Sequence, residues 1–114
     1  MTNYSGYMGK VALLDLSEGE VRDYPWSDED RRQYIGGKAM AEKLLADVLK
    51  EKTDALSPES PIVIATGPLT GTGAPCSNHF FVAALSPLGG GISVSGCGGD
   101  FGLYLKKAGF DALV

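Results

Sequence analysis

The stretch Ile62–Ser95, IVIATGPLTGTGAPCSNHFFVAALSPLGGGISVS, contains three short apolar runs in succession. The runs IVIAT, HFFVAAL and ISVS are rich in β-branched or aromatic residues and are bounded by glycine and proline, which predicts three strands. IVIAT is continuously apolar, which predicts burial on both of its faces. Because strands follow one another here without a helix between them, the pattern favours an α+β fold over a doubly wound parallel sheet.

The flanking segments extend this prediction in both directions. Upstream, KVALLDLSEGEVRDYP predicts a hairpin, and two helices follow it. Ser27 is the expected N-cap of the first helix, Gly36-Gly37 separates the two, and the second runs from about Ala39 to Lys50. Downstream, DFGLYLKKA predicts a short helix that Gly109 ends, and FDALV predicts a last strand. The predicted architecture is a mixed sheet with helices packed on it, in the order β-β-α-α-β-β-β-α-β.

The composition and charge of the chain limit the classes of function that it can have. The chain has 114 residues, the size of one small domain, and a net charge of −4 at pH 7. Its ten basic residues form no stripe, which argues against nucleic-acid binding. It has no apolar run long enough for a membrane span and no secretory signal pattern at the N-terminus, so we expect no membrane association and a cytoplasmic location. The last predicted strand reaches Val114, which predicts a domain that is one part of a longer protein.

Few side chains suggest chemistry of their own. With two cysteines 21 positions apart and one histidine, the chain lacks the four close donors of a zinc or iron–sulfur site. Cys97 lies near a helix N-terminus and could be a reactive thiol, although an ordinary thiol is the simpler interpretation. His79 could be a base, a metal ligand or a hydrogen-bond donor to a ligand, although a structural role is commoner. No catalytic residue is predicted, so an enzyme built on this chain would depend on a cofactor.

Glycine is the unusual component, with 16 residues concentrated in the second half of the chain. The loop SGCGGDFG (Ser95–Gly102) follows a predicted strand and opens a predicted helix, a place where backbone N–H groups can bind an anion. It matches neither the dinucleotide-binding GxGxxG unit nor the P-loop. From the pattern alone, a ligand cradle and a tight structural turn are equally supported.

Four segments that span nearly the whole chain carry a family resemblance. In order, they are GYMGKVALLDLSEGEV, YIGGKAMAEKLL, LSPESPIVIATGPLTGTGAP and SPLGGGISVSGCGGDFGLYLKKAGFDALV. Together they resemble the N-terminal domain of the aldehyde ferredoxin oxidoreductase family, whose members contain tungsten or molybdenum. The resemblance implies that residues 1–114 form roughly the first half of that pterin-supporting domain.

The resemblance also implies cofactors and partners. Family members hold the metal on two pyranopterins whose phosphates are bridged by magnesium, and they oxidise aldehydes to carboxylic acids. The electrons pass through a [4Fe–4S] cluster, bound by later domains, to ferredoxin. Partners would therefore be the remaining domains or subunits and ferredoxin, with a homodimer as one assembly. The alternative is a non-catalytic remnant or scaffold that keeps the fold and has lost the cofactor.

Carried over by position, the resemblance assigns six site residues. Gly96, Cys97, Gly98 and Gly99 correspond to the pterin-facing loop, and the Gly96 carbonyl corresponds to a magnesium ligand. His79 stands where the family usually has an arginine that links the pterin to the cluster, and histidine has a shorter reach. Lys38 stands where arginine is common and keeps the positive charge.

Overall fold

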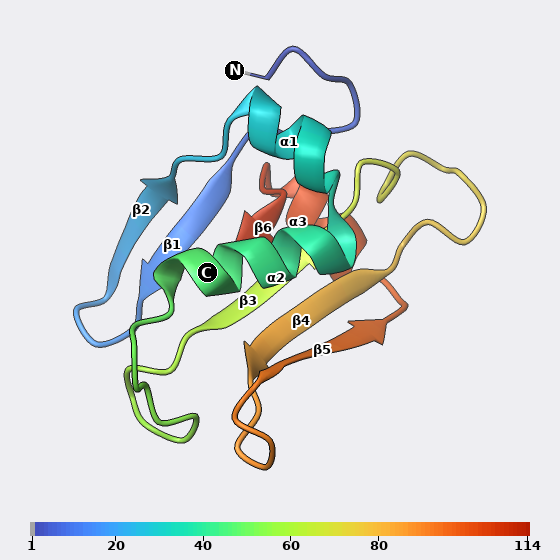
Figure 1. The fold of residues 1–114 in the computed structure, drawn as a ribbon. Coiled ribbons are helices and arrows are strands. Elements are labelled where there is room, and N and C mark those ends of the chain that lie inside the picture. Colours follow the sequence, from blue (N-terminus) through green and yellow to red (C-terminus); the bar gives the residue numbers. More distant parts are fainter. Residues whose placement is uncertain (1) are drawn as a thin grey trace.

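The computed structural model describes residues 2–114, and its helices and strands follow the predicted order (Figure 1). The strands are β1 (Val11–Asp15), β2 (Glu20–Tyr24), β3 (Ile62–Thr66), β4 (Phe80–Leu85), β5 (Ile92–Cys97) and β6 (Ala112–Leu113). The helices are α1 (Asp28–Tyr34), α2 (Gly37–Val48) and α3 (Phe101–Lys107). None of the helices in this part of the chain is long and apolar enough to cross a bilayer.

The six strands form one mixed sheet in the order β2-β1-β6-β3-β4-β5. The β1–β2 hairpin and the β3-β4-β5 meander are antiparallel. The two-residue strand β6 joins them, because it pairs parallel to β1 and antiparallel to β3. This arrangement confirms the predicted α+β class, with a short C-terminal strand at the centre of the sheet.

The core lies between α2 and one face of the sheet, as Figure 1 shows. Met40, Leu44 and Leu45 recur at helical spacing and are fully buried against β3 and β4. The predicted N-cap of α1 is confirmed, since Ser27 and Asp30 form a reciprocal capping box. Helix α2 begins at Gly37 rather than Ala39, with Gly36 at its N-cap.

Strand β3 is not covered on both faces along its whole length, so that prediction is wrong. Val63 and Ala65 are fully buried under α2. Ile62 is 59% exposed, and Ile64 lines an open groove of about 510 Å³ on the opposite face. The reason is that α2 covers one face of β3, whereas α3 packs near the end of β3, where Thr66 pairs with Phe80 and the Phe80 and Phe101 rings lie 5.0 Å apart.

Helix α3 ends in a Schellman motif at the predicted glycine. Gly109 has φ +97°, and its N–H donates to the Lys106 carbonyl at 2.9 Å. The Phe110 N–H donates to the Leu105 carbonyl at 3.2 Å, which completes the 6→1 and 5→2 pair. This reversal directs the chain into the interior at Asp111.

Asp111 is the hub of a buried polar network. Its side chain is 1% exposed and pairs with the Lys106 ammonium at 2.9 Å. The carboxylate also accepts the backbone N–H groups of Met8 and Gly9 at 2.9 and 2.8 Å. The Asp111 carbonyl accepts both the N–H and the hydroxyl of Thr66. A single residue thus fixes the N-terminal segment, α3 and the end of β3 relative to one another.

The N-terminal segment also restrains the junction between the first two helices. Ile35 has φ 59° and ψ −70°, a γ-turn conformation that is rare for a β-branched residue. The Gly36 N–H closes the turn on the Tyr34 carbonyl at 2.7 Å, and the Tyr7 hydroxyl donates to the Ile35 carbonyl at 2.5 Å. The Tyr7 ring is flanked by the cations of Arg31 and Lys106, each 5.7 Å from its centroid.

Removal of the Asp111 carboxylate should strongly destabilise the domain. We expect Asp111→Ala to lower the free energy of unfolding by about 3–5 kcal/mol, because the Lys106 charge and two backbone N–H groups stay buried without their partner. Chemical denaturation followed by circular dichroism measures this loss. Glu20→Ala, which removes the exposed ion pair with Arg22, is the control and should cost less than about 1 kcal/mol. Equal losses in the two variants would contradict the assigned role of Asp111.

Candidate functional site

The β4–β5 register brings the predicted site residues together. Phe80 pairs with Cys97, so His79, one residue before β4, lies opposite Gly98, one residue after β5. A Cβ atom placed on Gly98 would be 3.7 Å from the His79 Nε2 atom. The His79 side chain is exposed. His79 and the Gly96–Gly99 loop therefore form one surface at the end of the β4–β5 pair.

The Thr66–Pro75 loop positions the His79 backbone. Thr70 is 3% exposed, and its hydroxyl oxygen accepts the Gly67 N–H at 3.1 Å. The same hydroxyl lies 3.4 Å from the His79 carbonyl, to which it donates. Gly102, in the first turn of α3, packs against Thr70, since a Cβ there would be 3.2 Å from the Thr70 methyl group. The TGPLTG segment thus acts as a structural support behind the site.

The three glycines of the Gly96–Gly99 loop have different reasons to be glycine. A Cβ on Gly96 would lie 3.0 Å from the Phe81 ring, so a side chain there is accommodated only if the ring shifts. Gly99 has φ +102°, which L-residues rarely adopt. Gly98 has neither constraint, because its Cβ would make only an ordinary contact with His79. Neither packing nor backbone conformation requires glycine at position 98, where bare backbone faces solvent beside His79.

The Phe81 ring connects this loop to the start of α2. A Cβ on Gly37 would lie 3.2 Å from one edge of the ring, and the Cβ on Gly96 would approach another edge. Lys38, directly after Gly37, has a side chain that is 64% exposed, with its ammonium 3.8 Å from the Glu42 carboxylate. The structure therefore places the α2 start on the side of Phe81 away from Gly96. Sequence reasoning missed Phe81, whose neighbours depend on strand register and helix placement.

The thiols and metal donors give no further centre in the described residues. Cys76 and Cys97 are both exposed and unpaired. The Cys97 sulfur lies 3.3 Å from the Gly98 carbonyl oxygen. Residues 2–114 contain no group of three His, Cys, Asp or Glu side chains that could hold a metal ion.

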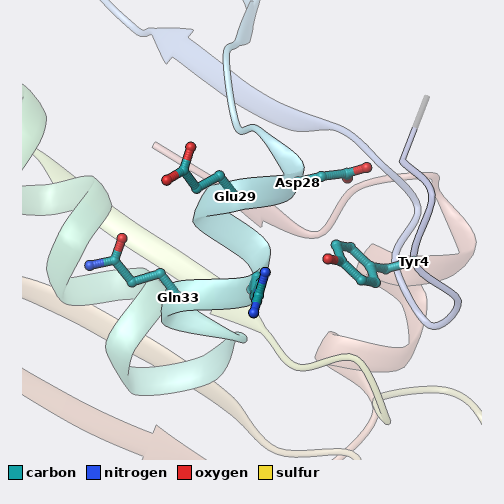
Figure 2. Close-up of a pocket in the computed structure, with 5 residues that line it drawn as sticks. Tyr4, Asp28, Glu29 and Gln33 are labelled. Atoms are coloured by element: carbon teal, nitrogen blue, oxygen red, sulfur yellow. The ribbon is translucent and has the colours of Figure 1, made fainter.

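A polar hollow of about 570 Å³ lies elsewhere, between α1 and the N-terminal segment (Figure 2). Tyr4, Asp28, Glu29, Arg32 and Gln33 line it. Hydrogen bonds from the Thr2 hydroxyl and the Asn3 N–H hold the pKa of Asp28 below its ordinary value. The carboxylate of Asp28 thus anchors the N-terminal segment to α1, which is a structural role.

Comparison with known proteins gives the class of this domain. The chain is 38% identical over 109 residues to the tungsten-containing aldehyde ferredoxin oxidoreductases of Pyrococcus horikoshii and Pyrococcus furiosus. It is 32% identical to a P. furiosus protein described as aliphatic sulfonate oxidoreductase, WOR-like subunit. A solved structure, the active site complex BamBC of benzoyl coenzyme A reductase with 1,5-dienoyl-CoA, superimposes with a TM-score of 0.89 at 30% identity. The named relatives are oxidoreductases or a reductase complex, so the fold and these similarities define a domain of a kind found in that class of enzyme.

The family is defined by the domain match. Residues 11–114 match the description "Aldehyde ferredoxin oxidoreductase, N-terminal domain", and the chain belongs to this family. The alignment with the P. horikoshii protein covers 96% of this chain and 18% of that relative. The match to the solved structure likewise covers 96% of this chain and 17% of the longer one.

Alanine substitutions should distinguish the structural constraints at the three loop glycines. We expect Gly98→Ala to change the free energy of unfolding by less than about 0.5 kcal/mol, because its Cβ has room. Gly96→Ala should cost about 1–3 kcal/mol through the clash with Phe81, and Gly99→Ala about 1–2 kcal/mol through backbone strain. Urea denaturation of the three variants measures these changes in the free energy of unfolding. A Gly98→Ala loss as large as that of Gly96→Ala would show that packing constrains position 98.

Acid should weaken the attachment of the N-terminal segment. Because the folded pKa of Asp28 is lowered, its stabilisation is complete above the ordinary carboxyl pKa of 3.8 and is lost as the pH falls through the folded value. The melting temperature should therefore fall as the pH drops below about 3.8, and Asp28→Asn should flatten this dependence. Gln33→Ala, an exposed position in the same helix, removes no titrating group; it is the control and should leave the slope unchanged. An unaltered slope in Asp28→Asn would exclude this linkage.

Proposed function

We propose that this domain supports a tungsten bis-pyranopterin cofactor in an oxidoreductase that converts aldehydes to carboxylates. The observation that carries the proposal is the bare backbone at Gly98, which neither packing nor conformation requires. Glycine at such a position leaves room for a flat ligand to approach the backbone. When bound, the cofactor would supply the metal-centred oxidation and reduction, and the residues of this chain would bind and orient it.

The Gly96 carbonyl fits the proposed contact with magnesium. Hydrogen-bonded pairs alternate along an antiparallel ladder, and Ser86 donates to the Gly91 carbonyl just before β5. By this alternation, the N–H and C=O groups of the odd-numbered β5 residues form hydrogen bonds with β4. The N–H and C=O groups of Gly96 point in the opposite direction, outward from the edge of the sheet. A free carbonyl oxygen is a suitable ligand for a hard cation, and magnesium would need further oxygens from phosphates and water.

His79 and Lys38 have proposed roles in binding and orientation. The exposed His79 ring lies beside Gly98 and can donate a hydrogen bond to a pterin or phosphate group. Thr70 holds the backbone of His79, so the direction of that donor is set by the loop behind it. Lys38 contributes positive charge at the start of α2, where no side chain caps the free backbone N–H groups. Both features favour a phosphate group nearby. We assign no catalytic side chain to this chain.

The aldehyde is the substrate class that the relatives favour. Relatives named for aldehyde oxidation reach 38% identity, compared with 32% for the sulfonate oxidoreductase and 30% for the benzoyl coenzyme A reductase complex. Since the chain spans less than a fifth of these relatives, the [4Fe–4S] cluster, ferredoxin as acceptor and the remaining domains belong to the proposal for the whole protein.

The test compares Gly98→Val with Gly91→Val in the full-length protein that contains this domain. Gly91 lies at the other end of the β4–β5 hairpin, with no atom within 4 Å of its added Cβ and no positive φ, so it controls for the loss of glycine. We expect Gly98→Val to lower tungsten and pterin content at least tenfold, whereas Gly91→Val should keep wild-type content. Elemental analysis, fluorescence of oxidised pterin and aldehyde-dependent dye reduction provide the readouts. A wild-type protein without pterin and tungsten would overturn the proposal and favour the cofactor-free scaffold.

A further inference from the structure

The turn between α1 and α2 contains a strained residue, Ile35. Its φ of 59° and ψ of −70° belong to the strained form of the γ-turn, which a β-branched residue rarely adopts. Within residues 2–114 the Ile35 side chain is 60% exposed, so core packing in this segment does not hold the turn. Strained backbone persists only where surrounding contacts hold it, and it is concentrated at functional sites. The turn therefore directs attention to the residues that follow it.

The γ-turn sets the direction in which α2 begins. Gly36 is the N-cap of α2 and Gly37 is its first residue, and Lys38 comes next. A Cβ on Gly37 would lie 3.2 Å from the Cε2 atom of Phe81, whereas one on Gly96 would lie 3.0 Å from the Cε1 atom of the same ring. A shift of the turn would therefore move both the start of α2 and the ring that packs against the Gly96–Gly99 loop.

Tyr7 holds this turn from the N-terminal segment. Its hydroxyl donates to the Ile35 carbonyl at 2.5 Å. Its ring lies between the cations of Arg31 and Lys106, each 5.7 Å from the ring centroid, and these contacts orient the hydroxyl. Burial, followed by the Asp111 carboxylate, raises the pKa of Tyr7, so the hydroxyl stays protonated and donates at neutral pH.

We propose that Tyr7 is a positioning residue for the cofactor, because its hydroxyl holds the Ile35 turn in the conformation that presents the start of α2 to a cofactor phosphate. This inference rests on the proposed function, and Tyr7 acts through Ile35 without touching the ligand. The preceding residue, Gly6, packs on the loop that positions His79, since a Cβ there would lie 2.6 Å from the Pro68 carbonyl oxygen. One short segment thus contacts both parts of the chain to which binding groups are assigned.

The test measures cofactor content in the full-length protein that contains this domain. Tyr7→Phe removes the hydroxyl and keeps the ring between its two cations. We expect it to lower tungsten and pterin content about threefold or more, as measured by elemental analysis and by fluorescence of oxidised pterin. Tyr24→Phe is the matched control, because it removes a hydroxyl that bonds to Asp47 near the other end of α2. This control should keep wild-type content.

A rescue variant separates positioning of the turn from a general effect on stability. Glycine adopts a positive φ without a Cβ clash, so Ile35→Gly reduces the need for the hydroxyl. Tyr7→Phe combined with Ile35→Gly should therefore regain most of the wild-type cofactor content. Amide hydrogen exchange followed by mass spectrometry gives a readout that needs no cofactor. The peptide that contains Ile35 and Gly36 should exchange faster in Tyr7→Phe than in the wild type.

The outcomes distinguish this inference from the proposed function. Wild-type cofactor content in Tyr7→Phe would overturn the role of Tyr7 and leave the proposed function standing. The same holds for an equal loss in Tyr24→Phe, for a loss that Ile35→Gly does not reverse, and for unchanged exchange at Ile35 and Gly36. A wild-type protein without tungsten and pterin would overturn the proposed function and the role of Tyr7 together.

Discussion

The ion pair between Asp111 and Lys106 is the constraint on which the remaining arrangement depends. A buried charge is tolerated only when it is paired and hydrogen-bonded, so the two N–H groups from the N-terminal segment are as necessary as the ammonium. The Asp111 carbonyl then fixes Thr66 at the end of β3. From there the chain enters the loop whose Thr70 hydroxyl holds the His79 backbone. The position of the candidate site is therefore linked to an interior salt bridge through Asp111, Thr66 and Thr70.

Local patterns predicted the elements well, and non-local contacts explain what they missed. The capping box at Ser27, the stop at Gly109 and the strand runs each depend on a few neighbouring residues, so the order of elements was readable. The sequence identifies Lys106 only as a basic residue near a helix end. In the structure it is 5% exposed and donates to the Gly6 carbonyl, 100 positions away. The closeness of His79 and Gly98 was implied by the family resemblance, whereas the role of Phe81 between α2 and the loop required the register and packing of the whole sheet.

Glycine enrichment in this chain has several physical origins, and only some concern a ligand. A Cβ on Gly6 would lie 2.6 Å from the Pro68 carbonyl oxygen, and one on Gly36 would lie 2.9 Å from that of Thr66. These glycines allow three backbone segments to meet at the end of β3. The same argument assigns Gly96 to packing against Phe81 and leaves Gly98 to the surface. Counting glycines could not separate these cases, because the distinction depends on what surrounds each Cβ position.

The central position of β6 has a consequence for biosynthesis. Ala112 and Leu113 lie between the β1–β2 hairpin and the β3-β4-β5 meander, and the sheet is continuous only through them. A ribosome makes the chain from the N-terminus, so both larger parts of the sheet emerge before the strand that joins them. Until then their inner edges are exposed and can pair wrongly or attract a chaperone. The domain can complete its sheet only after residue 113 has been made, which makes its folding a late event in translation of this segment.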